Sequence, residues 1–377
     1  MRRGIDGRFS VFSVQFSVFW GDVGVNTLIQ FSKPRLTIPT ATAWYLGDLG
    51  EALGKQQLFT KQSPQRLNAL REHALIESAV SSNRIEGVEV DHKRIGTVLF
   101  GRPVLRDRSE EEVRGYRRAL DMIHSEGRKL QVSEKLIRQL HELIRGDVWD
   151  AGKYKDKDGD IIERYGDGRS RVRFSPTSAA ATPAAMAELV AAWTSCHREK
   201  WVPPLIALAA FNLDFLCVHP FRDGNGRVSR LLLLLQCYQL GMEVGKYISI
   251  ERLIEQNKVR YYETLEHCSR GWHGGTHDPW PFINHILFVL KQAYHEFEQR
   301  VGQTTEPKGT KAQLVRGAVA GQAGEFRVTD IERACPGVGR EWIRAVLAQM
   351  RKAGEVRCQG RGPAARWRKI RSKRTTL

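Results

Sequence analysis

A short run near the middle of the chain combines a histidine, an aspartate, two glycines and three arginines in a fixed order. It extends from His219 to Arg230 and reads HPFRDGNGRVSR. The apolar residues on either side predict that a buried helix ends near Val218 and that another begins near Gly226. The start of a helix presents unpaired backbone amides and the positive end of a dipole, and both favour phosphate. The run therefore predicts an anion-binding loop between two helices.

The residue types inside the run are suited to a polyphosphate. Gly224 and Gly226 let the backbone approach an anion closely, so that the amides form a nest. Phosphate would repel Asp223 unless a cation lay between them, and Mg²⁺ binds both carboxylate and phosphate oxygens. Arg227 and Arg230 are three residues apart, so they share one face of the new helix and can both contact phosphate.

His219 supplies the remaining requirement, because an imidazole can accept a proton from an attacking hydroxyl near neutral pH. Phosphoryl transfer needs little beyond positioning, charge neutralisation and such a base. The alternative is a plain connection between helices in which Asp223 acts as a cap. The coincidence of so many residue types in this order favours the catalytic interpretation.

The run from His219 to Arg230 resembles the signature of the Fic-domain family, and the similarity extends by the order of elements from about Ile38 to Val301. The resemblance implies an all-α Fic fold that binds ATP with Mg²⁺. It also implies transfer of AMP to a Tyr, Thr or Ser hydroxyl of a target protein, which can include the enzyme itself.

The resemblance also implies a role for each site residue. His219 would be the base and Asp223 the magnesium ligand, while Arg227 and Arg230 would hold the outer phosphates. The other nucleotide contacts would come from the same loop and from a tyrosine pair downstream: Phe221, Gly224, Asn225, Gly226, Tyr261 and Tyr262. For the tyrosine pair, simple packing of aromatic rings on a core is the alternative.

A β-hairpin is predicted between residues 160 and 173, where short β-type runs flank a turn at Tyr165–Gly168. In Fic proteins such a hairpin is a flap that aligns the target segment by strand addition. The arginines of this hairpin make it more basic than expected for a flap.

An upstream segment, Ser82–Gly87, reads SNRIEG and resembles the inhibitory motif of Fic proteins. The inhibitory residues would be Ser82, Glu86 and Gly87. In that arrangement Glu86 pairs with Arg230 and occupies the space needed by the γ-phosphate. The alternative is a surface glutamate near the end of a helix at Gly87.

Helical periodicity accounts for most of the remaining sequence before residue 302. We expect an N-terminal helical region over residues 38–130, which carries the inhibitory motif, and a catalytic core over residues 131–301. Helices are predicted over residues 133–145, 183–196, 203–218, 251–268 and 281–301. The helix over 203–218 and a second, leucine-rich one after Arg230 are apolar nearly all round, which predicts burial.

The C-terminal part differs in charge. Residues 307–377 contain seventeen Lys and Arg against five Asp and Glu, so they hold +12 of the net charge of +17. After a linker over residues 302–310, residues 311–377 resemble a winged helix-turn-helix domain, with a helix over residues 340–353 and a two-stranded wing. DNA is the expected partner, with that helix in the major groove and Arg366, Arg368 and Lys369 near phosphates. A solvated basic tail and a protein-binding wing are the alternatives.

Residues 1–37 are expected to be an N-terminal extension, either strand-like or disordered. Phe9–Trp20 superficially resembles an export signal, but polar residues interrupt it and it is too short to span a bilayer. The six cysteines are scattered, with no Cys-x-x-Cys pair, which predicts reduced thiols and a cytoplasmic location. No membrane partner is expected, and a homo-oligomer is left open.

Two other functions are compatible with these residues. One is a Fic enzyme that removes AMP or transfers another phosphate-containing group. The other is a DNA-binding transcriptional regulator whose Fic domain only senses a nucleotide. The unmodified GNGR segment favours ATP and AMP transfer over the first, because this cradle accommodates a full triphosphate.

Overall fold

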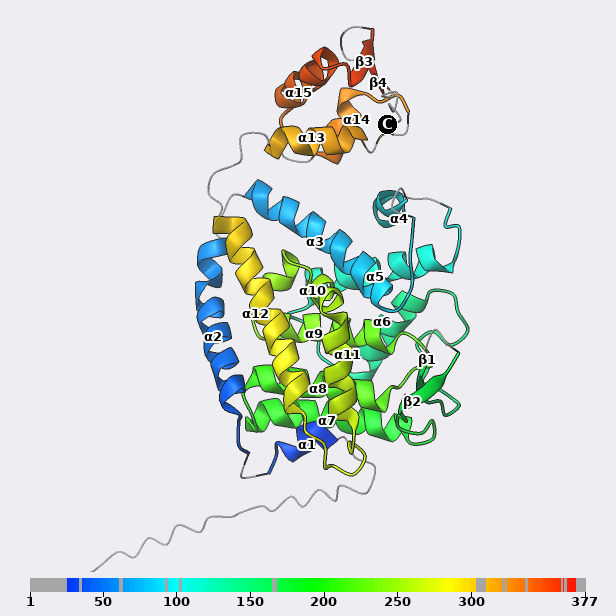
Figure 1. The fold of residues 1–377 in the computed structure, drawn as a ribbon, viewed down its shortest axis with the longest axis vertical. Coiled ribbons are helices and arrows are strands. Elements are labelled where there is room, and N and C mark those ends of the chain that lie inside the picture. Colours follow the sequence, from blue (N-terminus) through cyan, green and yellow to red (C-terminus); the bar gives the residue numbers. More distant parts are fainter. Residues whose placement is uncertain are drawn as a thin grey trace, which may run out of the picture.

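The described residues form two units, each with its own hydrophobic core (Figure 1). The first core extends from Leu28 to Val301 and the second from Val315 to Trp367. The computed structural model describes residues 26–33, 36–60, 64–91, 94–101, 104–164, 168–302, 310–320, 322, 324–335, 338–360, 362 and 365–370. Most of the predicted linker lies outside the described residues.

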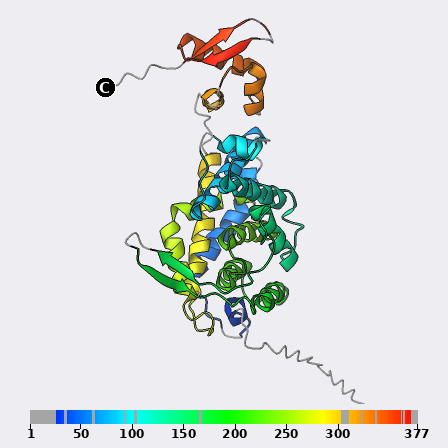
Figure 2. The ribbon, with the colours of Figure 1, turned by 90° about the vertical axis from the view of Figure 1, so that its right-hand side faces the viewer.

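The first unit is a group of helices packed around a central pair, with one small hairpin at its edge (Figures 1 and 2). The central helix α8 contacts α1, α7, α9, α11 and α12, and all of its residues from Ile206 to Val218 are buried. This confirms the predicted buried helix. The elements of this unit are α1 (Asn26–Gln30), α2 (Thr40–Thr60), α3 (Pro64–Ile85), α4 (Ile95–Phe100), α5 (Arg108–Glu126), α6 (Glu134–Arg145), β1 (Ile161–Arg164), β2 (Ser170–Phe174), α7 (Thr182–Glu199), α8 (Pro204–Val218), α9 (Asn225–Gln239), the 3₁₀-helix η1 (Val244–Lys246), α10 (Ile250–Gln256), α11 (Lys258–Ser269) and α12 (Trp280–Gly302).

Local chemistry sets the ends of the two central helices. Proline at the first position of α8 needs no intrahelical hydrogen bond, and Pro220 follows the helix where its ring prevents further turns. Gly224 precedes α9 with φ of 84°, a conformation that favours glycine. A Cβ atom at Gly224 would also lie 3.1 Å from Cδ1 of Ile144 in α6. The loop between α8 and α9 is therefore short and closely packed.

The predicted hairpin is present as β1 and β2, which pair antiparallel with Ile162 opposite Val172 and Arg164 opposite Ser170. It projects from the side of the helical unit (Figure 2). Ile162 and Val172 are 50% and 54% exposed, so apolar side chains lie on the surface here. The turn residues 165–167 lie outside the described residues.

One predicted helix is divided in the structure. Residues 251–268 were expected to form a single helix, but they belong to α10 and α11, which meet at Asn257. Asn257 leaves the helical conformation, with φ of −111° and ψ of 26°, and its Nδ2 donates to the Leu253 carbonyl at 2.9 Å. An asparagine side chain competes with the backbone for hydrogen bonds, and here it ends α10.

The expectation of a strand-like or disordered extension up to residue 37 is wrong for residues 26–33, which include helix α1. Leu28 and Phe31 are 0% and 2% exposed and belong to the first core. Asp214 of α8 accepts hydrogen bonds from the backbone nitrogens of Thr27 and Leu28, both at 2.9 Å, and from Nε1 of Trp272 at 2.7 Å. No local pattern predicts this, because the partner carboxylate lies almost two hundred residues away in the sequence. Residues 1–25 lie outside the described residues.

The C-terminal unit contains three helices followed by a two-stranded sheet, in the predicted order. Helix α15 packs against α13, α14 and β3. Its residues Ile343, Val346, Leu347 and Met350 are buried. The elements are α13 (Thr310–Ala320), α14 (Val328–Ala334), α15 (Arg340–Lys352), β3 (Val356–Gln359) and β4 (Arg366–Lys369). Among the described residues of the whole chain, no helix is both long and apolar enough to cross a bilayer.

Replacing Leu28 tests whether the segment before α2 is part of the first core. We expect Leu28→Ala to lower the free energy of unfolding by about 3 kcal/mol, because a fully buried leucine leaves a cavity when truncated. Denaturant unfolding followed by circular dichroism measures this. Val104→Ala is the control, because Val104 is 91% exposed and should change stability by less than about 0.5 kcal/mol. An equal effect of the two substitutions would contradict the assignment.

Candidate active site

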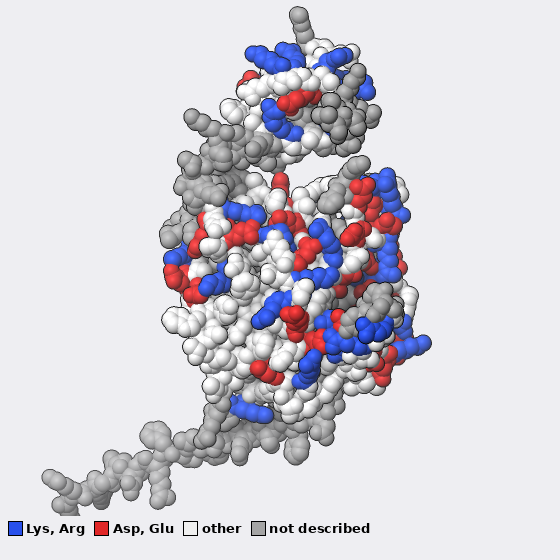
Figure 3. Space-filling view, in the orientation of Figure 1, with Lys and Arg blue, Asp and Glu red and all other residues white. Residues whose placement is uncertain are grey.

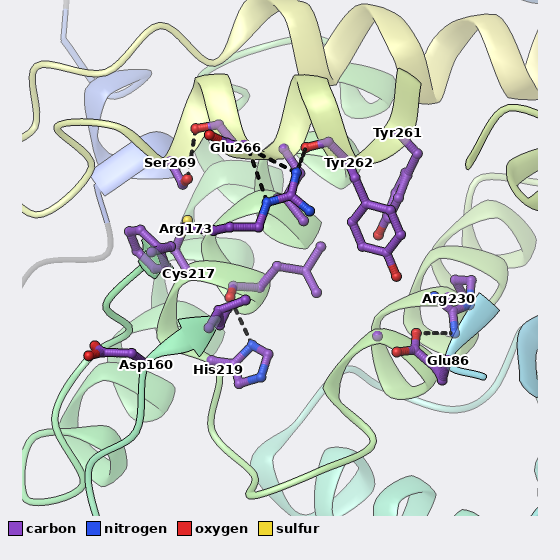
Figure 4. A pocket seen from close by; sticks show the side chains of 15 residues that line it. Glu86, Asp160, Arg173, Cys217, His219, Arg230, Tyr261, Tyr262, Glu266 and Ser269 are labelled. Atoms are coloured by element: carbon purple, nitrogen blue, oxygen red, sulfur yellow. Dashed lines mark hydrogen bonds and ion pairs between the residues drawn. The ribbon is translucent and has the colours of Figure 1, made fainter. Parts of the chain in front are cut away.

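His219 ends α8 in a left-handed backbone conformation, with φ of 51° and ψ of 61°. Its Nδ1 lies 3.3 Å from the Leu216 carbonyl oxygen (Figure 4). Because a carbonyl oxygen only accepts, Nδ1 carries the proton and Nε2 keeps a free lone pair. Burial, followed by the charge of Lys155, lowers the pKa of His219 to about 4. The imidazole is therefore neutral at pH 7 and can accept a proton.

Lys155 holds the backbone that carries His219. Its Nζ donates to the carbonyls of Val218 and His219, at 3.1 and 2.9 Å, and its backbone nitrogen donates to the Pro220 carbonyl at 2.8 Å. The last carbonyls of a helix lack intrahelical partners and carry partial negative charge, which a lysine satisfies. Burial lowers the pKa of Lys155 to about 8.

Phe221 and Asn225 build the loop itself. Asn225 Oδ1 accepts from the Phe221 nitrogen at 2.9 Å, and its Nδ2 donates to the Phe221 carbonyl at 2.7 Å. The Phe221 ring stacks on His141, with centroids 3.8 Å apart and planes at 2°. His141 Nδ1 accepts from the Gly152 nitrogen at 3.0 Å, so Nε2 carries the proton and donates to the Asp223 carbonyl at 3.0 Å. These contacts fix the loop before any nucleotide binds.

Asp223 belongs to a closed ring of two carboxylates and two guanidinium groups, which we call the acidic-basic ring. Arg145 Nη1 lies 2.5 Å from Asp223 Oδ2, and Arg227 Nη2 lies 3.4 Å from Asp223 Oδ1. Glu112 contacts the same two arginines, with Oε1 3.2 Å from Arg145 Nη1 and Oε2 2.6 Å from Arg227 Nη1. Each charge in the ring thus lies between two charges of opposite sign.

Burial differs sharply around this ring. The side chains of Glu112, Arg145 and Arg227 are 4%, 4% and 1% exposed, whereas that of Asp223 is 52% exposed. Burial by itself raises the pKa of Asp223, but Arg227 and Arg145 outweigh it and lower the pKa below its ordinary value. Asp223 is therefore a carboxylate that reaches solvent. Arg227, expected to hold a phosphate, is enclosed and does not line the cavity.

The chemistry of Asp223 fits the predicted magnesium ion. Mg²⁺ is usually held by one or two carboxylates, with water and substrate phosphates completing its coordination. Asp223 supplies one such carboxylate at the exposed corner of the acidic-basic ring. Within the described ranges, no group of three or more His, Cys, Asp or Glu side chains forms a ready metal cage. The protein thus offers a partial site that phosphate oxygens would complete.

Glu86 lies directly against the first turn of α9. Its Oε1 is 2.7 Å from Nη2 of Arg230, whose side chain is 2% exposed (Figure 4). A Cβ atom at Gly226 would lie 2.3 Å from the same Oε1, so only glycine allows this approach. Ser82 also holds Arg230, because its Oγ accepts from Nε at 2.8 Å and its carbonyl from Nη2 at 2.9 Å. A carboxylate therefore lies where the helix start would attract an anion.

The end of α3 directs Glu86 into this position. Gly87 has φ of 79°, and its nitrogen donates to the Arg84 carbonyl while the Val88 nitrogen donates to the Asn83 carbonyl, both at 3.0 Å. A left-handed glycine with such bonds ends a helix. Asn83 Oδ1 also accepts from Arg227 Nη1 at 3.2 Å. The motif thus contacts Arg227 and Arg230, two of the three arginines of the signature.

A cavity of about 350 Å³ connects His219, Arg230 and the predicted tyrosine pair (Figure 4). Tyr261 is 3% exposed, and burial raises its pKa to about 12. Its ring meets that of Tyr262 edge to face, with centroids 5.4 Å apart. The lining residues are Glu86, Asp160, Ile161, Arg173, Phe174, Leu216, Cys217, His219, Gly226, Arg230, Tyr261, Tyr262, Leu265, Glu266 and Ser269.

The basic hairpin is bound to α11 through one carboxylate. Glu266 lies 2.8 Å from Arg171 Nη1, 2.9 Å from Arg173 Nη2 and 3.0 Å from Arg270 Nη2. Burial raises the pKa of Glu266, but the three arginines together lower it to about 2. Arg171 and Arg173 alternate along β2, so they share the face that turns toward α11. These two arginines anchor the hairpin, which accounts for its unexpected charge.

The structure brings together some of the predicted site residues and places others behind them. The cavity is lined by Glu86, His219, Gly226, Arg230, Tyr261 and Tyr262. The supporting positions around it are Ser82, Gly87, Phe221, Asp223, Gly224, Asn225 and Arg227.

Sequence reasoning missed several residues that shape the site. His141 had a usable signal, because it is a polar residue on the apolar side of the predicted helix over 133–145. Glu112, Arg145, Lys155 and Glu266 had none, because each acts through partners far away in the sequence. Only the packing of α5, α6, α9 and α11 brings these charges together.

Comparison with known proteins agrees with this geometry. Residues 131–237 match the model of the Fic/DOC family. That match includes the loop from His219 to Arg230 and the hairpin, and it ends within α9. The chain therefore contains a Fic/DOC family domain.

Solved structures extend the likeness of the fold beyond that domain. A Fic family protein from Desulfovibrio desulfuricans G20 is 24% identical with a TM-score of 0.58, over 91% of this chain and 100% of its own. A Fic domain containing signaling protein from Bacteroides thetaiotaomicron VPI-5482 is 22% identical with a TM-score of 0.57, over 68% and 98%. Fic-1 (aa134 - 508) from C. elegans is 19% identical with a TM-score of 0.54, over 70% and 74%. At these identities the likeness establishes the fold alone.

Glu112→Gln tests the acidic-basic ring. We expect a loss of about 3 kcal/mol in the free energy of unfolding, because two buried arginines lose the buried one of the two carboxylates that they share. Denaturant unfolding measures it. Glu111→Gln is the matched control, since Glu111 is the exposed neighbour on the same helix. If both variants were as stable as the wild type, the ring would not hold these arginines in place.

Proposed function

We propose that this chain transfers AMP from ATP to a hydroxyl side chain of a target protein, with Mg²⁺ bound. The observation that carries the proposal is the position of His219. Its neutral imidazole lies in the same cavity as Arg230 and the start of α9. A proton acceptor and an anion-binding site therefore line one cavity. The coarser assignment, transfer of a phosphate-containing group to proteins, rests on the Fic/DOC domain.

His219 acts as the general base in this scheme. The hydroxyl oxygen of the target forms a bond to the α-phosphorus of ATP, and its proton moves to Nε2 of His219. The bond between the α-phosphorus and the oxygen that bridges to the β-phosphate breaks, and pyrophosphate leaves. The hydrogen bond from Nδ1 to the Leu216 carbonyl keeps the ring in the tautomer that can accept this proton.

The start of α9 and Arg230 bind the phosphates. The backbone amides after Gly224 lack intrahelical partners, and Arg230 presents a buried guanidinium beside them. Asp223 is the residue that would hold Mg²⁺, which supplies neutralisation of the phosphate charge when bound. Arg227 reaches a phosphate only if it exchanges its contact with Glu112. Tyr261 and Tyr262 line the part of the cavity where the adenine of the nucleotide would lie.

The hairpin presents the target. Ile162 and Val172 lie opposite each other and are exposed, which suits contact with side chains of an extended segment. The salt bridges to Glu266 hold β2 beside the cavity. A hydroxyl side chain on a segment added to this hairpin would thus reach His219.

Glu86 inhibits the reaction in this proposal. Its carboxylate is in contact with Gly226 and paired with Arg230, so it competes with a phosphate for the same amides and the same cation. A triphosphate bound beside Glu86 would be displaced from the pose needed for attack on its α-phosphorus.

Glu86→Gly is expected to raise AMP transfer by about tenfold or more, a change of about 1.4 kcal/mol or more in the activation free energy. The variant is incubated with ATP labelled at the α-phosphate and a cell lysate, and labelled protein is measured. Glu89→Gly is the control, because Glu89 is exposed and does not line the cavity. Adding His219→Ala to Glu86→Gly should abolish labelling.

The alternatives give other results in the same assay. Label that enters protein only from γ-labelled ATP would indicate phosphate transfer. Loss of label from a previously modified target would indicate removal of AMP. Binding of ATP without labelling from either position would favour a nucleotide sensor and would overturn the proposal.

The pKa of His219 predicts how the rate depends on pH. An ordinary histidine would lose its lone pair to protonation near pH 6.5, but His219 has a pKa of about 4 and stays neutral above pH 5. We expect kcat of Glu86→Gly to be unchanged from about pH 8 down to about pH 6. A rate profile in constant-ionic-strength buffers checks this, and a halving of kcat near pH 6.5 would contradict the assigned environment.

A further inference from the structure

The outer face of the C-terminal hairpin carries a cluster of arginines. Arg357 lies directly opposite Arg368, and Gln359 lies opposite Arg366. Alternate residues of a strand face opposite sides, so these four side chains share one face. The other face includes Val356 and Trp367, which are buried against the second core. We call the exposed set, Arg357, Gln359, Arg366 and Arg368, the arginine face.

Two of these arginines have no countercharge. Within the part of the chain that the structure describes, neither Arg357 nor Arg368 makes an ion pair, and Arg366 only approaches Glu325 at 3.9 Å. Like charges directly opposite on a sheet destabilise it. The hairpin thus carries a cost in stability that a bound anion would remove.

Several basic residues elsewhere in this unit already have a partner in an ion pair or a hydrogen bond. On α15, Arg340 lies 2.9 Å from Glu332 and Arg344 lies 2.6 Å from Glu341. Lys369, expected to contact phosphate, donates from Nζ to the Ala320 carbonyl at 2.6 Å, at the end of α13. The first arginines of α15 are thus paired with acids, whereas Arg351 and Lys352 in its last turn, like Arg357 and Arg368 of the hairpin, make no ion pair within the described residues.

We infer that the arginine face binds the backbone phosphates of double-stranded DNA. In Figure 2 the hairpin forms the outermost layer of the C-terminal unit, with its helices on one side only. Lys and Arg side chains predominate over Asp and Glu on the part of this unit that Figure 3 shows. A surface of this kind is complementary to a polyanion.

Several features favour duplex DNA over other polyanions. The three cations are arginines, whose planar groups bind phosphate through two parallel hydrogen bonds. A two-stranded ribbon fits the major groove of B-form DNA, whereas the major groove of an RNA duplex is too narrow for side chains to enter. Gln359, in the middle of the face, is an amide that can contact the edge of a base. This inference is independent of the proposed AMP transfer.

Fluorescence anisotropy of a labelled mixed-sequence DNA duplex tests it with the full chain over a series of salt concentrations. Arg357→Ala/Arg368→Ala should lower the affinity at low salt about tenfold or more. It should also reduce the slope of log K against log salt by about 1.8, because each phosphate contact contributes about 0.9. Circular dichroism confirms that the variant is folded.

Two further variants serve as controls. Arg128→Ala/Arg198→Ala removes the same charge from the first unit, where these side chains are 65% and 69% exposed, and should leave binding unchanged. Arg340→Ala/Arg344→Ala tests α15, and it should weaken binding less than the hairpin variant.

Three outcomes would overturn the inference. The first is a wild-type chain that does not bind duplex DNA at low salt. The second is a larger loss from the α15 variant than from the hairpin variant. The third is equal binding of an RNA duplex or of anionic lipid vesicles, which would indicate a general attraction for negative charge. None of these results depends on the labelling assays with ATP.

Discussion

Two buried arginines in the first turns of α9 need countercharges, and the rest of the site is arranged to supply them. Arg227 and Arg230 are 1% and 3% exposed, at the end of a helix that already carries positive charge. Leaving such groups unpaired in the interior would be strongly destabilising. Glu112 and Asp223 satisfy Arg227, and Glu86 with Ser82 satisfies Arg230. A triphosphate would enter a place that carboxylates already occupy.

In the proposed function, this arrangement would link inhibition by Glu86 to the stability of the fold. Three of the residues that hold the two arginines, Ser82, Glu86 and Glu112, come from α3, the turn after it and α5, which precede the segment that matches the Fic/DOC family model. The N-terminal helices are thus part of the charge balance of the site, and any nucleotide that binds must replace some of their contacts. Glu86 lines the cavity and 26% of its side chain is exposed, whereas that of Glu112 is only 4% exposed.

The hairpin and the C-terminal sheet use arginine in opposite ways. On β2, Arg171 and Arg173 form ion pairs with Glu266, and these ion pairs hold the hairpin beside α11. On β3 and β4, Arg357 and Arg368 face each other without an acid within the described residues. The two hairpins differ in this respect because only the first has a glutamate of a neighbouring helix, Glu266 of α11, against its arginines.

The sequence by itself determined the local features of this protein. Local patterns were enough to predict the loop, most helices, the hairpin and the Fic resemblance. These patterns are the order of residue types from His219 to Arg230, the SNRIEG motif and the helical periodicities. Such features depend on residues close in sequence, whose side chains follow a fixed backbone period. Tertiary structure decided which charges meet. Glu112 binds Arg227 across 115 residues, and Asp214 holds Thr27 across 187. Charge pairing over such distances leaves no periodic trace, because it depends on how the helices pack.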